Sequence, residues 1–243
     1  MIQKLIDLIS SSRYCVALTG AGVSTLSGIR DFRGKNGIYN DYDADRLFDI
    51  GYFRKDPSFF YTMSKDFIYA FHEKEPGLIH VELARLEQKG VVKAVITQNI
   101  DMLHAKAGSR NVVEIHGSPK LHRCLECGKE YGYDEIAKRV RSGEIPRCTS
   151  CKGIVKPDIV FFGEPLDHVS YGRSIDECGK ADLILALGTS LVVQPAASLP
   201  FATLDNGGKL VIINDMETPL DQFAALKLDD LVESFTAVRE KIG

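Results

Sequence analysis

The chain has 243 residues, 44% hydrophobic and 26% charged, which is typical of a globular protein with a sizeable core. Its formal net charge of −3 argues against bulk affinity for nucleic acid or for a membrane surface. No apolar run is long enough to span a bilayer, and residues 1–13 mix charges with apolar residues at helical spacing, which favours an amphipathic helix over a secretory signal. We therefore expect a cytoplasmic protein.

Strands and helices alternate along most of the chain. Apolar runs predict buried strands at residues 14–19, 91–99, 112–117, 183–191 and 209–214. Helical patterns occupy residues 1–13, 56–71, 77–90 and 229–243, and residues 194–208 form a crossover. This alternation predicts an α/β fold with a parallel, Rossmann-like sheet.

Residues 118–157 interrupt this pattern with a segment rich in Cys, Arg, Lys and Gly. Two Cys-x-x-Cys pairs, Cys124 with Cys127 and Cys148 with Cys151, are separated by 20 residues, a spacing typical of four-thiolate zinc sites. Four protein ligands leave no open coordination position, so we expect a structural Zn²⁺ rather than a catalytic one. Unmetallated thiols or a redox pair are the alternatives.

These patterns predict two domains. Residues 1–117 and 158–243 would form the Rossmann-like nucleotide-binding domain, and residues 118–157 an inserted zinc-binding module. The remaining cysteines, Cys15 in a strand and Cys178 near a helix end, are expected to be core residues.

The first strand leads into a glycine-rich loop. Gly20, Ala21 and Gly22 would let the backbone turn tightly and approach a pyrophosphate, although such turns also occur without a ligand. Thr25 stands where a redox dinucleotide fingerprint has its third glycine, and no second strand with an acidic residue follows. A long polar and aromatic loop follows instead, and such a loop suits a site that closes over a ligand.

Several motifs in this order resemble the sirtuins, the NAD-dependent protein lysine deacylases, in a compact bacterial or archaeal form. They are GAGVS…GIRDFRG, TQNIDMLH, IHG before the cysteine pairs, KPDIVFFGE, GTSLVV and VIIN. The resemblance covers nearly the whole chain. It implies that NAD and an acyl-lysine peptide meet in a cleft between a Rossmann-like domain and a zinc-binding domain. Sirtuins break the bond between nicotinamide and ribose, so they need no redox fingerprint.

The resemblance assigns catalytic roles to His116, Asn99 and Asp101. His116 would be the general base that activates the ribose 2′-hydroxyl, and an imidazole titrating near neutral pH suits this task. Asn99 would order the ribose or water, and Asp101 would bind the nicotinamide carboxamide. The alternatives are a structural histidine at a strand end and an aspartate that caps the next helix.

The resemblance also implies NAD contacts on several loops. Phe32 would separate nicotinamide from the acyl group, and Arg33, beside Asp31, would contact phosphate; as ordinary loop residues they would have no such role. With Asp101 and His116, the expected NAD-binding residues are Ala21, Gly22, Thr25, Phe32, Arg33, Gln98, Ile100, Gly188, Thr189, Ser190, Asn214 and Asp215.

Two extended segments would border the peptide, which could add between them as a strand. An apolar channel would accept lysine only after acylation has removed its charge. A buried strand is the alternative for the apolar residues. The expected substrate-binding residues are Val160, Phe162, Gly163, Glu164 and Val193.

Two features bear on substrate choice and affinity. The family usually has Pro where this chain has Arg30, which frees φ in the loop and adds a cation near the expected phosphates. Sirtuins that prefer succinyl or malonyl groups carry a Tyr-x-x-Arg pair, and no Tyr here has Arg three residues later. We therefore expect acetyl or another uncharged acyl group.

The expected activity is NAD-dependent protein lysine deacetylation, which yields nicotinamide, free lysine and O-acetyl-ADP-ribose. An NAD-dependent protein ADP-ribosyltransferase and a non-catalytic NAD-binding module are the alternatives. We expect acetyl-lysine proteins or peptides as partners, no direct nucleic acid, no membrane, and a monomer.

Overall fold

The computed structural model describes residues 1–31, 37 and 44–242. The NAD contacts expected at Phe32 and Arg33 therefore lie outside the described residues. Within the described part of the chain, no helix has the length and apolarity needed to cross a membrane.

The main sheet has six parallel strands in the order β3-β2-β1-β7-β8-β9. Every residue of β1 and β7, the two central strands, is buried, as continuous apolar runs require when helices cover both faces. The strands are β1 (Cys15–Thr19), β2 (Val92–Thr97), β3 (Val112–Glu114), β7 (Leu183–Leu187), β8 (Lys209–Ile213) and β9 (Ala224–Leu228). The predicted parallel α/β sheet is confirmed, and β9 is an addition to the predicted strands.

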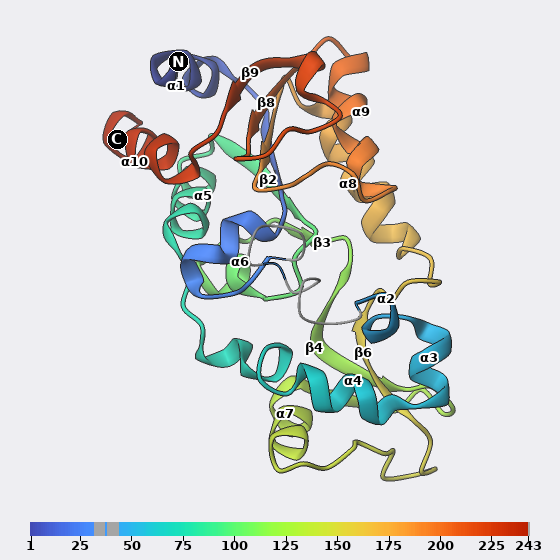
Figure 1. Cartoon of the computed structure of the whole chain (residues 1–243). Helices are drawn as coiled ribbons and strands as arrows, with labels where there is room; N and C mark the ends of the chain where they lie inside the picture. The colour runs from blue at the N-terminus through green and yellow to red at the C-terminus, as the bar shows by residue number, and fades with distance from the viewer. Residues whose placement is uncertain (32–36, 38–43, 243) are drawn as a thin grey trace.

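Helices cover both faces of this sheet (Figure 1). One face packs against α1 (Ile2–Ser11), α5 (Leu78–Gln88) and α10 (Leu231–Lys241) through aliphatic residues such as Leu83 and Val238. The other face packs against α8 (His168–Lys180) and α9 (Leu199–Asp205). The helix α9 follows the 3₁₀ turn η4 (Ala196–Ser198) within the predicted crossover.

A second, antiparallel sheet has the order β5-β4-β6 and lies beyond the end of the main sheet (Figure 1). Its elements are β4 (Gly117–Cys124), β5 (Glu130–Gly132), β6 (Val155–Ile159) and the helix α7 (Tyr133–Arg141). An earlier part of the chain packs on it through Phe53, Phe60 and Tyr69. That part comprises α2 (Ala44–Leu47), α3 (Ile50–Lys55), α4 (Pro57–Ser64) and η3 (Ile68–Glu73).

The helix predicted at residues 56–71 is thus two pieces, α4 and the 3₁₀ helix η3. The Ser64 hydroxyl donates to the carbonyl oxygen of Phe60 at 2.6 Å in the last turn of α4, a side-chain bond that slightly destabilises and often bends helices. The predicted domain boundaries stay a proposal. The packing of residues 47–71 on the small sheet adds a segment that the sequence did not assign to it.

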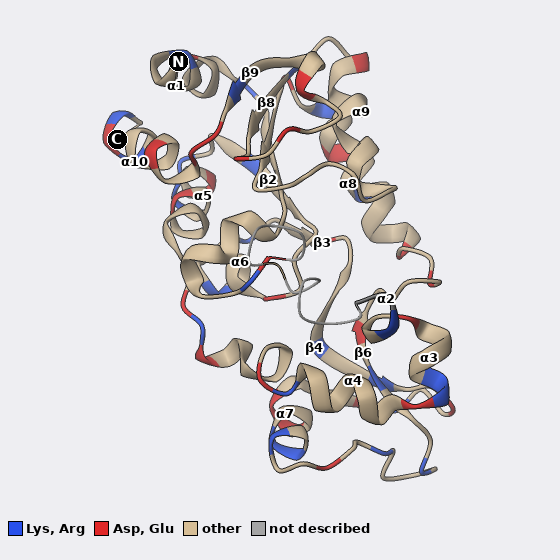
Figure 2. Ribbon diagram, viewed as in Figure 1, with Lys and Arg blue, Asp and Glu red and all other residues tan. Residues whose placement is uncertain are grey.

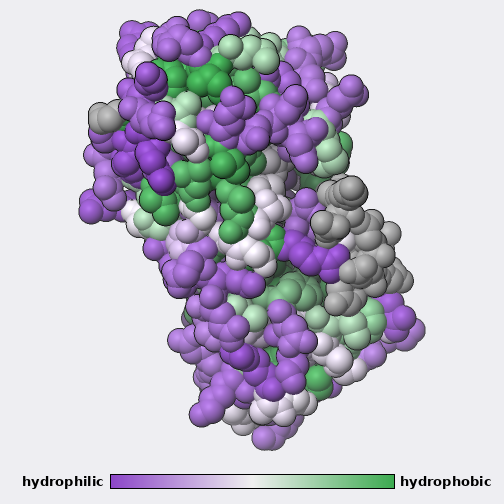
Figure 3. All heavy atoms as spheres, turned by 60° about the vertical axis from the view of Figure 1, so that its left-hand side comes forward, coloured by the Kyte–Doolittle hydropathy of each residue, from purple (hydrophilic) through white to green (hydrophobic). Residues whose placement is uncertain are grey.

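Charged residues of both signs lie mainly on helices and loops of both parts (Figure 2). Hydrophilic residues cover much of both ends of the face in Figure 3, and apolar residues gather in its upper half. The remaining short elements are η1 (Ala21–Ser27), α6 (Leu103–Lys106) and η5 (Asp221–Phe223).

Candidate active site

A cavity of about 680 Å³ opens where the main sheet meets the small one. Its walls include the segments that follow β1, β2, β7 and β8, at residues 20–22, 98–100, 188–190 and 214–216, together with residues 159–166 after β6. Ligands of open α/β sheets bind at this carboxyl edge, where the chain connections leave in opposite directions. The sheet order places that point between β1 and β7.

The loops after β1 and β7 touch through their main chains. The Gly22 N–H donates to the carbonyl oxygen of Gly188 at 2.9 Å, and a Cβ added to Gly22 would lie 2.7 Å from the Gly188 Cα. Gly188 itself has φ +55, a conformation that favours glycine. The cavity is therefore lined here by backbone, as the approach of a pyrophosphate requires.

His116 lies on the cavity wall just after β3, with Nδ1 2.9 Å from the carbonyl oxygen of Gln98. A carbonyl can only accept, so Nδ1 carries the proton and Nε2 keeps its lone pair. Burial lowers the pKa of His116, and the bond to Gln98 opposes that shift. The imidazole is therefore neutral at pH 7 and can accept a proton at Nε2.

A buried hydrogen-bond network joins Asn99 to Asp101. The Asn99 amide donates to the carbonyl oxygen of Gly20 at 3.0 Å and to the Ser24 hydroxyl at 3.1 Å. The Ser24 hydroxyl donates in turn to Asp101 at 2.6 Å. Asp101 also accepts from the Leu103 N–H, at the first residue of α6, at 2.9 Å. It therefore bonds the start of that helix, as the alternative interpretation expected, although the N-cap position itself is Met102. Asn99 lines the cavity, whereas Asp101 lies behind it, connected through Ser24.

The sequence did not single out Ser24 and His80 as site residues. Nδ1 of His80 accepts from the Gly77 N–H at 3.2 Å, which leaves Nε2 as the donor to the Ser24 hydroxyl at 3.3 Å. Desolvation lowers the pKa of His80, and the charge on Asp101 opposes that shift. Only the fold brings these residues together, because His80 lies on α5, 56 positions from Ser24.

Of the other expected NAD-binding residues that the structure describes, most line the cavity and Thr25 does not. Thr25 is exposed and outside the cavity lining, and its hydroxyl donates to the carbonyl oxygen of Gly22 at 3.0 Å. Gln98 donates to the Thr189 hydroxyl at 2.9 Å and so links the segments after β2 and β7. The expected residues that line the cavity are Ala21, Gly22, Gln98, Asn99, Ile100, His116, Gly188, Thr189, Ser190, Asn214 and Asp215.

All five expected peptide-binding residues line the cavity: Val160, Phe162, Gly163, Glu164 and Val193. Phe162 is 43% exposed, whereas its neighbour Phe161 is buried in the aromatic core of the small sheet. The Phe162 N–H donates to the carbonyl oxygen of Phe48 at 2.7 Å, and the Phe162 carbonyl oxygen accepts from Ile50 at 3.1 Å. The lining also includes Phe48, Leu166, His168, Tyr171, Gln194 and Met216, which the sequence did not suggest.

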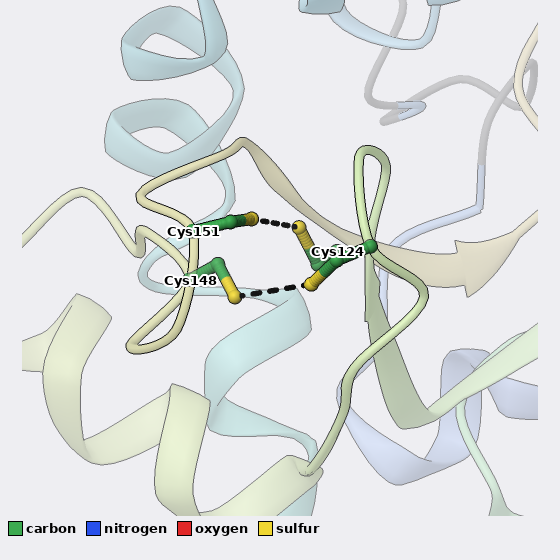
Figure 4. Close-up of side chains that lie close together, drawn as sticks. Cys124, Cys148 and Cys151 are labelled. Atoms are coloured by element: carbon green, nitrogen blue, oxygen red, sulfur yellow. Dashed lines mark hydrogen bonds between the residues drawn. The ribbon is translucent and has the colours of Figure 1, made fainter.

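The four cysteines of the two pairs meet at the far end of the small sheet, where two loops turn toward each other (Figure 4). Their sulfur atoms all lie within 4.8 Å of one another, with Cys124 3.4 Å from Cys151 and Cys127 3.5 Å from Cys148. The Tyr131 hydroxyl donates to the Cys148 sulfur at 3.1 Å, as partners behind a thiolate ligand do. The cluster is consistent with a structural zinc ion held by four thiolates.

Comparisons with known proteins agree with this arrangement. The Sir2 family model matches residues 20–195. The chain is 46% identical over 243 residues to the NAD-dependent protein deacetylase of Thermotoga maritima, covering 100% of this chain and 98% of that protein. It is 42% identical over 231 residues to the NAD-dependent protein deacylase 2 of Archaeoglobus fulgidus, covering 93% and 90%.

Solved structures lead to the same family. A structure of Sir2 with a p53 peptide and NAD⁺ matches with a TM-score of 0.93 at 44% identity, covering 100% of this chain and 99% of that one. A histidine-to-alanine variant of Sir2 with a deacetylated p53 peptide and 3′-O-acetyl ADP-ribose matches with a TM-score of 0.94 at 46% identity, covering 99% and 98%. The chain belongs to the Sir2 family. It is an NAD-dependent protein deacetylase, and NAD is its cosubstrate.

Proposed function

We propose that the cavity binds NAD over the segments that follow β1, β7 and β8, and the acetyl-lysine peptide against residues 160–164 and Val193. The observation that carries this proposal is the orientation of His116 on the wall between the two ends. Its Nδ1–H is fixed by Gln98, which leaves Nε2 as a base at the cavity. A base is needed where a ribose hydroxyl must become a nucleophile.

The reaction begins when the acetyl oxygen of the substrate lysine attacks C1′ of the ribose and nicotinamide leaves. His116 then takes the proton of the ribose 2′-hydroxyl, whose oxygen attacks the carbon of the resulting imidate. Water completes the transfer and releases free lysine and O-acetyl-ADP-ribose. The neutral state of His116, which burial favours, makes this proton transfer available at physiological pH.

The network of Asn99, Ser24, Asp101 and His80 supplies the nicotinamide end of the site. The Asn99 amide is fixed by two acceptors, so it presents a set orientation toward the ribose. We assign the carboxamide contact to Asp101, as the family resemblance implies; its two oxygens accept from Ser24 and from Leu103, and it lies behind Asn99 rather than on the cavity wall. Thr25 is assigned to the pyrophosphate region with Ala21 and Gly22. Phe32 and Arg33 keep the roles that the family resemblance gives them, and they lie outside the described residues.

The peptide adds as a strand beside residues 160–164. One edge of this segment is already closed, because both main-chain groups of Phe162 bond to Phe48 and Ile50. Gly163 follows in a turn, with φ +89 and with the Glu164 N–H bonded to the Phe161 carbonyl oxygen at 3.0 Å, and it lines the cavity. Val193 also lines the cavity, and a peptide between it and Gly163 would take its affinity from main-chain hydrogen bonds.

The cavity favours acetyl or another uncharged acyl group over succinyl. Among the described residues that line it there is no Lys or Arg, so a distal carboxylate would be buried without a cation. Comparing acetyl and succinyl versions of one peptide tests this, and faster turnover of the succinyl peptide would contradict it. The expected cytoplasmic location and monomeric state stay predictions.

The central experiment follows nicotinamide release by mass spectrometry, with NAD and with or without an acetyl-lysine peptide. We expect release to require the peptide and to yield O-acetyl-ADP-ribose. In His116→Ala, the steady-state formation of O-acetyl-ADP-ribose should fall by about 10²–10⁴-fold, the usual contribution of a general base, because His116 acts after nicotinamide has left. His72→Ala, which changes an exposed histidine on η3, is the matched control and should retain full activity. Peptide-independent release with ADP-ribose on protein would indicate the transferase instead.

A further inference from the structure

Lys156 is a buried lysine on β6, just before the peptide edge of the cavity. Only 6% of the residue is exposed. Its ammonium donates to the carbonyl oxygens of Pro157 at 3.1 Å and Ile159 at 2.6 Å, and it forms an ion pair with Glu164 at 2.9 Å. An ammonium has three N–H donors, and these three acceptors match that number.

These contacts fix the turn that forms the cavity wall. The Glu164 oxygen that faces Lys156 also accepts from the Phe161 N–H at 2.8 Å, and the Glu164 N–H donates to the Phe161 carbonyl oxygen at 3.0 Å. Lys156 therefore holds both ends of the segment from Ile159 to Glu164. This segment contains four of the five residues assigned to the peptide.

Packing alone does not account for a charged residue at this position. Burial lowers the pKa of Lys156, and the hydrogen bond and charge of Glu164 oppose that shift. The fold therefore removes this cation from water and stabilises its charge with a carboxylate. The ammonium lies 4.4 Å from the centroid of the Phe161 ring, within the aromatic core of the small sheet. An apolar side chain of similar volume would avoid the desolvation penalty that a buried ion pair carries.

We propose that Lys156 is a positioning residue for the acyl-lysine peptide, because its buried ammonium fixes residues 159–164 in the shape that pairs with the peptide strand. The inference rests on the proposed function, which places the peptide at this edge. Lys156 itself does not line the cavity, so it acts through Glu164 and the main chain rather than by touching substrate.

A second lysine provides a matched comparison at the other end of the cavity. Lys227 on β9 donates to the carbonyl oxygens of Asn214 at 2.5 Å and Met216 at 3.2 Å, and it pairs with Asp229 at 3.3 Å. Asn214 and Met216 line the cavity at the end assigned to NAD. The two lysines thus hold one cavity-lining segment each, at opposite ends.

The test measures KM for the acetyl-lysine peptide and KM for NAD separately, on zinc-loaded full-length protein. In Lys156→Met we expect the peptide KM to rise about tenfold, the usual effect of losing hydrogen bonds from a charged group, with the NAD KM changed less than about twofold. Lys156→Arg should recover part of the loss because it keeps the charge. Lys227→Met should show the opposite pattern, raising the NAD KM and sparing the peptide KM.

Equal changes in both KM values for Lys156→Met, or a lower melting temperature with neither KM changed, would overturn the proposal. If that variant does not fold, Lys156→Arg and Glu164→Gln decide it. Glu164→Gln keeps an acceptor for Phe161 but removes the charge, so it should raise the peptide KM, and an unchanged KM in both variants would also overturn the proposal. The wild-type protein distinguishes failure of the proposed role of Lys156 from failure of the proposed function. If the wild type consumes NAD without peptide, the proposed function itself is rejected.

Discussion

The main sheet and the small sheet are stabilised by different kinds of contact. The core around β1 and β7 is aliphatic, with residues such as Leu18 and Leu185 fully buried between two helical layers. The core around β4 and β6 is aromatic and polar. There the Tyr69 hydroxyl shares a hydrogen bond with Nε2 of His122 at 3.0 Å, and Lys156 lies against the ring of Phe161.

The difference follows from size. A large sheet covered on both faces removes enough apolar surface from water to be stable by packing alone. The small sheet has three strands and needs other interactions, namely edge-to-face rings such as Phe53 against Phe161, buried hydrogen bonds and a four-cysteine cluster that is consistent with a structural zinc ion. Its stability should therefore depend on bound metal in a way that the main sheet's does not.

Removing the metal should have the largest effect. In Cys148→Ser we expect loss of bound zinc, unfolding of β4–β6 and loss of deacetylation, because zinc supplies about 10–16 kcal/mol in small metal-dependent folds. Hydrogen exchange read by mass spectrometry should show fast exchange in residues 117–159 and continued protection of β1 and β7. Protection of β4 in the metal-free variant would contradict this contrast.

A core substitution in the main sheet should act on the whole domain. Leu185→Ala removes a fully buried side chain from β7 and should lower the free energy of unfolding by about 2–5 kcal/mol in urea titration. Leu121→Ala on β4 is the control, because that leucine is 38% exposed and its loss should change stability by less than about 1 kcal/mol. Equal losses of stability in the two variants would mean that the burial of the side chain does not determine how much stability is lost.

Part of the pH dependence of the free energy of unfolding should come from His122. Burial first, and then the charge of Lys156, lower the pKa of His122 from 6.5 to about 3. The unfolded chain takes up this proton below pH 6.5 and the folded protein does not, so stability is full above that pH and falls by up to about 1.4 kcal/mol per unit toward pH 3.

Urea unfolding at pH 7 and pH 5 measures this slope. His122→Gln, which keeps an acceptor for Tyr69 but cannot titrate, should reduce the slope by about one proton. A slope should remain, because burial also lowers the pKa values of His80, His104 and His116. An unchanged slope in the variant would exclude His122 as a source.

The smallest expected effect is at the turn of the first cysteine pair. Gly128 has φ +72 with nothing near an added Cβ, so Gly128→Ala should lower stability by about 1 kcal/mol through backbone strain alone. Gly172→Ala, at an equally open site inside α8 where φ is not positive, should be neutral or slightly stabilising. Thermal melting of the two variants side by side measures the difference.

Local sequence patterns predicted the buried strands, the cysteine cluster and the glycine-rich loops, because each of these has a signature within a short stretch of sequence. Continuous apolar runs located the strands that begin at Cys15 and Leu183, and the cysteine spacing located the thiolate cluster. The loop glycines were found because strand ends and tight turns have local signatures. The residues at these strand ends that were expected to face a ligand do line the cavity, apart from Thr25 and Asp101.

The remainder depends on long-range contacts. The strand β9 is short and combines two alanines with Lys227, so it lacks an apolar run. Ser24 joins His80 only through the packing of η1 on α5, and the sequence assigns no partner to either. Likewise, nothing in the sequence around Lys156 marks it as buried, because lysines are usually exposed, and only its three acceptors in the folded chain distinguish it from a surface lysine.

The main-chain contact between Gly22 and Gly188 has a consequence for sequence variation. Each position lacks room for a single methyl group, because the obstacle is backbone rather than a side chain that could move. A side-chain substitution elsewhere does not move this backbone. In a library of all single replacements that is selected for deacetylase activity, these two positions should therefore return only glycine. The open glycines Gly143 and Gly207, in contrast, should tolerate many residues at a small loss of stability.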